Sequence, residues 1–175
     1  RDDYAAGRFD AACDWYLQLA TNNRERVFSC RSAWENRLGL YSAYLGGRAD
    51  LLKAIADGVE QKAKSFKTNE LYEVRFAVAA FAAADRGGAE MSKGWTAADD
   101  RFRAGVDDKV RLEVIDRVGQ VLARKFGPDR VMAFWEWRES RLKPTPRKHY
   151  RVAWSDRPVQ PETWDALKLE ESVFD

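Results

Sequence analysis

Residues 34–55 read WENRLGLYSAYLGGRADLLKAI and contain the pattern that decides the fold. Apolar residues stand three or four positions apart on both sides of Gly47: Trp34, Leu38, Tyr41, Leu51 and Ile55. Such spacings place side chains on one face of an α-helix. Glycine adopts the left-handed backbone angles of a tight turn at little steric cost. The stretch therefore predicts a helix, a glycine turn and a second helix.

The same pattern recurs every forty residues, with turn glycines at Gly7, Gly47, Gly87 and Gly127. Apolar residues follow each glycine by four and eight positions, and precede the last three by six, nine and thirteen. These residues are Ala11, Leu51, Met91 and Val131; Trp15, Ile55, Trp95 and Trp135; Tyr41, Phe81 and Val121; Leu38, Val78 and Val118; and Trp34, Val74 and Val114. A fixed period of this length is typical of repeat proteins, whose units stack to bury their apolar stripes.

We therefore expect an all-α protein: a short α-solenoid of stacked helical hairpins, with about seven helices and an extended C-terminal tail. The alternative is an irregular helical bundle in which the period is accidental. The repeat domain is expected over 1–142, and the tail, with one short helix from Pro161, over 143–175. The first three expected helices cover residues 8–19, 24–45 and 49–66. The next runs from 68 to the turn at 86–88, and a short one covers 89–95, after which Thr96 caps a further turn over 97–102. The last two run from 107 to the turn at 127, and from that turn to 142.

The composition is that of a globular chain with ample material for a core. The 175 residues are 45% hydrophobic, and the net charge of +2 does not favour strong binding of polyanions. No stretch approaches 18 consecutive apolar residues, so we expect no membrane span. Cys13 and Cys30 match no metal or redox motif and are expected to be buried thiols in a reducing compartment.

Residues 35–48 resemble the pentatricopeptide repeat, a helix–turn–helix family related to the tetratricopeptide repeat. That family reads Tyr-Asn, an apolar run, and then Ala-Tyr and Gly-Arg before its second helix. Here Ala43-Tyr44 and Gly47-Arg48 stand at the last two places. Residues 7–12 resemble the start of the second helix of that family, and residues 85–89 resemble the family's pattern more weakly. The resemblance covers about residues 5–140, with a period of forty instead of the mid-thirties of the family.

The resemblance implies an organellar protein with either RNA or protein as its partner. Many pentatricopeptide proteins bind RNA, one base per repeat, through polar residues at fixed helix positions. The nearest counterparts here are not a consistent set: Asn36, Arg75 or Glu73, and Asp116 or Arg117. A protein partner fits better. A small pentatricopeptide-type subunit associated with the mitochondrial F1-ATPase of trypanosome-like protists is similar in size and expected shape, so the F1Fo ATP synthase is the sharpest candidate assembly.

No group of residues in the sequence forms a recognisable catalytic, metal or phosphate-binding motif, so we expect no enzyme, no cofactor and no metal. His149 stands without Cys or carboxylate partners and is expected to be exposed. Paired carboxylates could serve acid–base or metal chemistry, but three of the four pairs lie near a helix start or a terminus, where helix caps and solubility explain them. The pairs are Asp2-Asp3, Asp99-Asp100, Asp107-Asp108 and Glu170-Glu171.

Partner-binding residues are expected mainly in the tail. Basic residues there interleave with an aromatic ring, a pattern that can pair with an acidic protein surface or with nucleic acid. Large apolar side chains in the tail are expected to pack along the repeat domain or across a partner. Trp137 lies off the tryptophan column and is expected to be an exposed interface anchor. The candidate set is Trp137, Arg147, Lys148, Tyr150, Arg151, Trp154 and Trp164.

The leading hypothesis is a non-catalytic helical-repeat accessory or scaffold subunit of a multi-subunit protein complex, located in mitochondria. The chain begins with Arg1, and removal of an Arg-rich organellar transit peptide would account for this start, as would a shortened chain. The alternatives are an organellar RNA-binding pentatricopeptide-like protein and a small bacterial immunity or inhibitor protein. The alternative location is a reducing cytosolic compartment.

Overall fold

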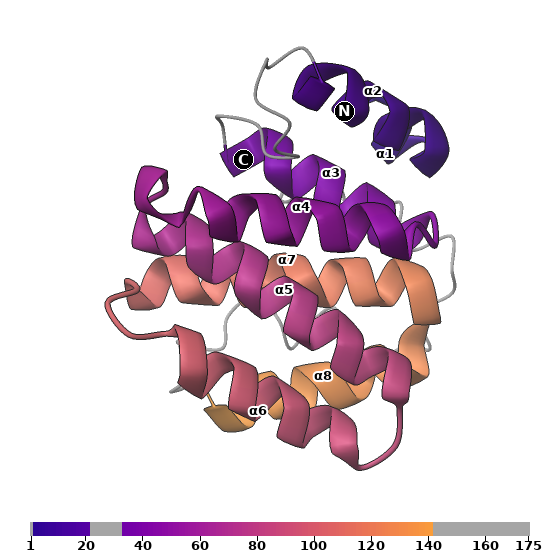
Figure 1. Cartoon of the computed structure of the whole chain (residues 1–175). Helices are drawn as coiled ribbons and strands as arrows, with labels where there is room; N and C mark the ends of the chain where they lie inside the picture. The colour runs from indigo at the N-terminus through magenta and orange to yellow at the C-terminus, as the bar shows by residue number, and fades with distance from the viewer. Residues whose placement is uncertain (1, 22–32, 142–175) are drawn as a thin grey trace. The chain divides into compact units, whose positions relative to one another are not determined.

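A computed structural model of the chain describes residues 2–21 and 33–141 (Figure 1). These residues form α-helices joined by short turns, and they contain no strand. The fold is all-α, as the sequence predicts. In chain order the elements are α1 (Asp2–Ala5), α2 (Phe9–Thr21), α3 (Ala33–Leu45), α4 (Ala49–Gln61), the 3-10 helix η1 (Ala63–Ser65), α5 (Thr68–Arg86), α6 (Glu90–Phe102), α7 (Asp108–Phe126) and α8 (Pro128–Arg141). The predicted tail lies outside the described residues.

The glycines of the forty-residue period all lie in turns between two helices. Gly47 donates its N–H to the Tyr44 carbonyl, and Arg48 donates to the Ala43 carbonyl. This pair of bonds is the Schellman cap, which requires a left-handed residue after the helix. The turn at Gly7 has the same pair of bonds. The prediction of glycine turns is confirmed by the φ angles: 74° at Gly7, 70° at Gly47, 73° at Gly87 and 77° at Gly127.

Gly47→Ala tests the backbone role of these glycines. A Cβ atom at this position would meet nothing within 4 Å, so the only cost is that of a left-handed φ for an L-residue. We expect the free energy of unfolding to fall by about 1–2 kcal/mol, measured by urea denaturation. Gly47→Asn should lose less, because asparagine tolerates this conformation. Equal stability of Gly47→Ala and the natural protein would contradict the prediction.

The chain divides into two compact units, Arg1–Val114 and Ile115–Asp175, with the boundary inside α7. In the first unit each helix from α1 to α6 contacts the next one, and α3 also contacts α5 (Figure 1). Contact with the next helix but one is what stacked hairpins produce, so this unit has a repeat-like arrangement. The described part of the second unit consists of the rest of α7 together with α8. A single repeat domain over 1–142 stays a prediction.

Helix α3 is buried on nearly all sides because it contacts α2, α4 and α5. Its tyrosines pack against one aromatic ring of α5. The ring of Tyr44 stacks on that of Phe81 with centroids 3.8 Å apart, and Tyr41 meets the same ring edge-on. Such aromatic pairs stabilise a core beyond the area that they bury. The apolar residues that α3 buries are Leu38, Leu40, Tyr41, Ala43 and Tyr44.

Most recurring apolar positions are buried, as the repeat predicts. Trp95 of α6 is 1% exposed, and its Nε1–H donates to the Ala80 carbonyl of α5 at 3.1 Å. Trp15 and Trp135 are half-buried, however, so the tryptophan column is not uniformly core. The other buried positions of the pattern are Leu38, Tyr41, Leu51, Ile55, Val74, Phe81, Val114, Val118, Val121 and Val131, whereas Val78 and Met91 are half-buried and Ala11 is exposed.

Helix α6 differs from its prediction because it continues without a break through Thr96 to Phe102. Gly94 lies so close to α5 that a Cβ atom there would be 2.6 Å from the Ala83 Cβ. This close crossing holds α6 along α5, so tertiary packing overrides the local preference of threonine for a cap. Two other boundaries also differ. The helix expected over 49–66 ends at Gln61 and is followed by η1, and α1 was not expected.

Candidate functional site

Trp137 is 5% exposed, so the expectation of an exposed anchor is wrong. It continues the buried face of α8 at a spacing of three residues, after Val131 and Phe134. Its ring centroid is 5.2 Å from that of Phe134. Trp137 therefore belongs to the core of the second unit. The other predicted site residues lie outside the described residues: Arg147, Lys148, Tyr150, Arg151, Trp154 and Trp164.

Most positions that the pentatricopeptide resemblance assigns to base reading bond to other side chains of the chain. Tyr16 donates its Oη–H to the Oδ1 of Asn36 at 3.1 Å, and this bond is buried. Two further candidates form bidentate ion pairs with a neighbouring helix: Arg75 with Glu60, and Asp116 with Arg138. Arg117 is buried, and Glu73 belongs to the cluster described next.

Helices α3 and α5 are joined by a buried carboxylate, which we call the Glu73 cluster: Glu73, Arg37 and Tyr41. Glu73 is 5% exposed. Its Oε1 accepts from the Arg37 Nε at 2.8 Å and from the Tyr41 Oη at 2.9 Å. Its Oε2 accepts from the Arg37 Nη2 at 3.1 Å. This fork-to-fork geometry is the strongest arrangement for a charged pair, and it fixes the angle between the partners.

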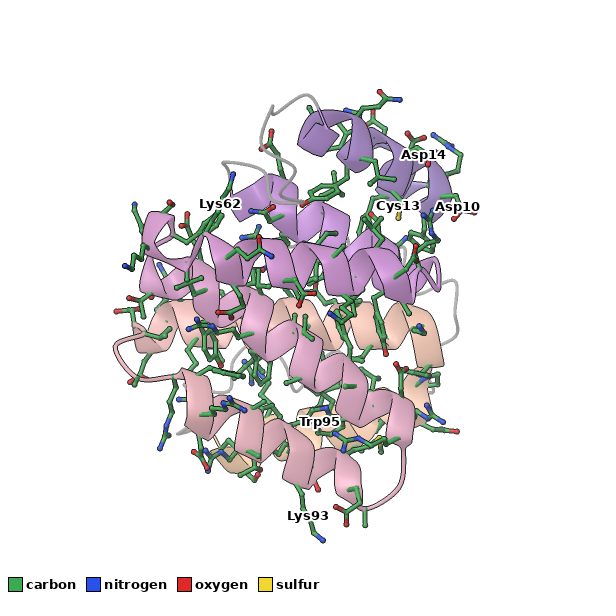
Figure 2. All side chains as sticks on the ribbon, viewed as in Figure 1. Asp10, Cys13, Asp14, Lys62, Lys93 and Trp95 are labelled. Carbon is green, nitrogen blue, oxygen red and sulfur yellow. The ribbon has the colours of Figure 1, made fainter. Side chains whose placement is uncertain are left out.

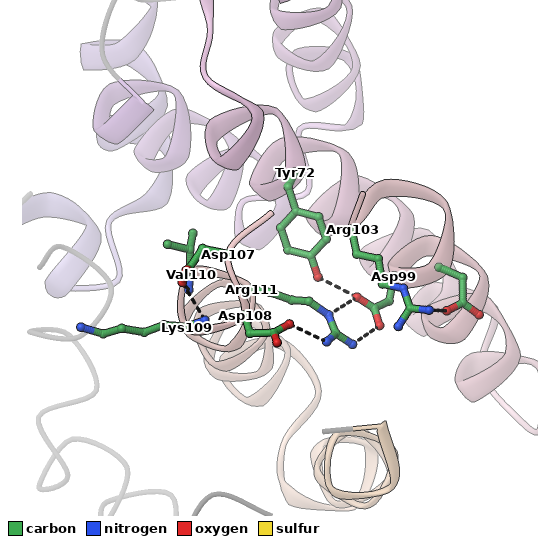
Figure 3. Close-up of polar contacts among 9 residues, drawn as sticks. Tyr72, Asp99, Arg103, Asp107, Asp108, Lys109, Val110 and Arg111 are labelled. Atoms are coloured by element: carbon green, nitrogen blue, oxygen red, sulfur yellow. Dashed lines mark hydrogen bonds and ion pairs between the residues drawn. The ribbon is translucent and has the colours of Figure 1, made fainter. Parts of the chain in front are cut away.

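A second cluster of the same design joins α5, α6 and the start of α7, and we call it the Asp99 cluster: Asp99, Arg111 and Tyr72 (Figure 3). Asp99 is 0% exposed. Its Oδ1 accepts from the Arg111 Nε at 2.7 Å and from the Tyr72 Oη at 3.0 Å. Its Oδ2 accepts from the Arg111 Nη2 at 2.5 Å. The hydrogen bond to Asp99 raises the pKa of Arg111, and burial, with the Asp99 charge, raises the pKa of Tyr72.

These two clusters hold helices in register. In both clusters an arginine fork and a tyrosine hydroxyl occupy the carboxylate oxygens. Burial of such a pair is costly unless the geometry is good and the remaining groups are bonded, as they are here. Asp99 is fully buried, whereas its neighbour Asp100 is exposed. Asp107 is a cap as predicted, since its Oδ1 accepts from the N–H groups of Lys109 and Val110 (Figure 3).

A small hollow opens beside the Glu73 cluster. Its walls come from α3, α4, α5 and the connection before α5, and it has room for about one water molecule. Asn36, Arg37 and Glu73 supply polar groups to it. A hollow of this size and polarity suits a single bound water, and it is too small for a drug-sized ligand. The remaining lining residues are Val59, Phe66, Glu70 and Val74.

Cys13 is a buried free thiol on α2, close to Asp10 and Asp14 (Figure 2). Burial, together with the nearby aspartates, raises the pKa of its thiol to about 11, although Arg48 opposes the shift. The thiolate is the nucleophilic form of cysteine, so we expect this side chain to react slowly at neutral pH. Burial of Cys13 agrees with the sequence, and Cys30 lies outside the described residues.

Alkylation with iodoacetamide tests the state of Cys13. At pH 8 we expect the folded protein to react far more slowly at Cys13 than the protein unfolded in urea, with peptide mass spectrometry separating the two cysteines. The raised pKa also favours the folded state below pH 9.0, the ordinary value, and this contribution is lost as the pH rises to about 11. Compared with Cys13→Ala, the natural protein should lose stability across that interval. Equal alkylation rates in the two states would contradict the prediction.

The fold defines an all-α, repeat-like protein. Comparison with known protein families, curated proteins and solved structures finds no match to this chain. Among residues 2–21 and 33–141, no helix is both long and apolar enough to cross a membrane. The same part of the chain contains no group of three or more His, Cys, Asp or Glu residues that could hold a metal ion.

Proposed function

We propose that the chain is a non-catalytic helical-repeat accessory or scaffold subunit of a multi-subunit protein complex. The observation that carries the proposal is the use of polar side chains inside the first unit. Asn36 and Glu73 would have to leave buried hydrogen-bond partners before they could read a base edge. Leaving a buried partner unpaired costs about 1–3 kcal/mol for each group. This cost favours a protein partner over RNA.

The proposed assembly is mitochondrial, and the F1Fo ATP synthase is its named candidate. This part of the proposal depends on the pentatricopeptide resemblance of residues 35–48. The proposed contacts are the basic and aromatic tail residues, because arginine and aromatic side chains are enriched at interface hot spots. They are Arg147, Lys148, Tyr150, Arg151, Trp154 and Trp164.

Native mass spectrometry of the endogenous protein tests the proposal. We expect the chain to appear in a complex with other protein subunits, and its co-purifying proteins identify the assembly. A free monomer as the only species would overturn the proposal. A tail variant with Arg147, Lys148 and Arg151 changed to Ala should weaken the complex, whereas Lys53→Ala, a matched change of an exposed cation on α4, should leave it intact.

RNA binding is the competing outcome, and fluorescence anisotropy with a labelled single strand measures it. Binding to RNA through basic residues weakens steeply as the salt concentration rises. Micromolar or tighter binding with that salt dependence would support the RNA alternative. An absence of binding at low salt would remove it.

A further inference from the structure

The Glu73 cluster and the Asp99 cluster meet at consecutive residues of one helix. Tyr72 of α5 donates to Asp99, and the next residue, Glu73, accepts from Arg37. Consecutive residues point about 100° apart around a helix axis, so α5 reaches α6 with one side chain and α3 with the next. A rotation or shift of α5 therefore moves a member of both clusters.

We propose that α5 couples the two clusters energetically, so that α3, α5, α6 and the first turns of α7 respond as one cooperative element. Both carboxylates are buried, so the loss of an arginine or tyrosine partner is costly in either cluster. The interior around them is closely packed and does not deform gradually. Arg37 also lines the small hollow beside the Glu73 cluster. A change at Arg37 is thereby transmitted through Glu73 and Tyr72 to Arg111.

A double-mutant cycle on the full chain tests the coupling. The variants are Glu73→Gln, Asp99→Asn and their combination, and urea denaturation gives the equilibrium constant of unfolding for each. For independent sites, the effects of two substitutions on the equilibrium constant of unfolding multiply to within about twofold, whereas for coupled sites they deviate further. We expect the combined variant to unfold at least about fivefold less readily than the product of the single changes, because the first change already releases α5. If the effects of the two single changes multiply to within twofold, the proposal is overturned.

The matched control is Glu60→Gln. Glu60 also forms a bidentate pair with an arginine of α5, Arg75, but this pair is exposed. When Glu60→Gln is combined with Asp99→Asn, the effects of the two changes on the equilibrium constant of unfolding should multiply. Coupling as large as that of Glu73→Gln would show a general softening of the fold and would overturn the proposal.

Tyrosine variants keep the test valid if a charge variant fails to fold. Tyr72→Phe removes a single hydroxyl from the Asp99 cluster. Hydrogen exchange should then accelerate in the amides of α3 as well as in α6 and the start of α7. Acceleration confined to α6 and α7 would show that α5 does not transmit the change, and would overturn the proposal.

Discussion

Asp99→Asn is expected to lower the free energy of unfolding by about 3–5 kcal/mol, the largest effect of a single substitution that we predict. The change keeps the size of the side chain but removes its charge. Arg111 then stays in a buried place without the carboxylate that binds its fork, and only the exposed Asp108 carboxylate remains near it, 3.6 Å from its Nη1 atom. A native domain has only about 5–15 kcal/mol of stability. The loss is therefore measurable by urea denaturation followed through tryptophan fluorescence.

Asp100→Asn is the matched control on the same helix. The Asp100 Oδ1 and Arg103 Nη2 atoms are 3.4 Å apart, and both side chains are close to half exposed. Exposed pairs contribute about 0–1 kcal/mol, so this variant should be nearly as stable as the natural protein. A second variant, Asp99→Asn with Arg111→Met, removes both charges and should regain much of the loss. Equal losses for Asp99→Asn and Asp100→Asn would show that the charge of Arg111 is not the cause.

The turns and the main apolar faces could be predicted because they depend on local rules that repeat. Only glycine enters the left-handed region cheaply, so the period of forty marked four helix turns that the structure contains. The start of α8 directly after Gly127 and the cap at Asp107 were predicted for similar reasons. Proline suits the first position of a helix, where α8 begins. A carboxylate before a helix accepts from its free N–H groups.

The buried clusters could not be predicted, because burial depends on which helices meet and not on the residue itself. Asp99 and Asp100 are neighbours of the same type, yet one is buried and the other is exposed. Trp137 was misplaced for a related reason. The forty-residue period predicted Trp135 as the buried tryptophan of this helix, whereas α8 buries the face with Val131, Phe134 and Trp137.

The sequence also contains a signal for the close helix contacts. Gly39 and Gly119 each stand eight residues before a turn glycine, and Ala79 occupies the same place in the middle repeat. Small residues at fixed repeat positions let a neighbouring side chain approach the helix backbone. In the structure Gly119 lies under the ring of Trp135, and Gly39 lies under the ring of Tyr16.

Gly39→Ala is expected to lower the free energy of unfolding by about 2–3 kcal/mol, near the upper end for overpacking a core. A Cβ atom at this position would lie 2.4 Å from the Cδ2 atom of the Tyr16 ring. The ring cannot move away freely, because it is buried and its hydroxyl donates to Asn36. Urea denaturation measures the loss, and Gly119→Ala should show a similar one, since its Cβ would lie 2.7 Å from the Trp135 ring.

The Tyr16→Ala background separates the ring contact from the backbone effect of the same change. Without the ring, an alanine at position 39 meets no such obstacle, and it favours the helix over glycine by up to about 1 kcal/mol. Gly39→Ala should therefore be neutral or stabilising in Tyr16→Ala, although it destabilises the natural protein. If the substitution costs the same in both backgrounds, the penalty comes from somewhere other than Tyr16. A reversal of sign would show that the missing Cβ of Gly39 is what lets α2 and α3 pack closely.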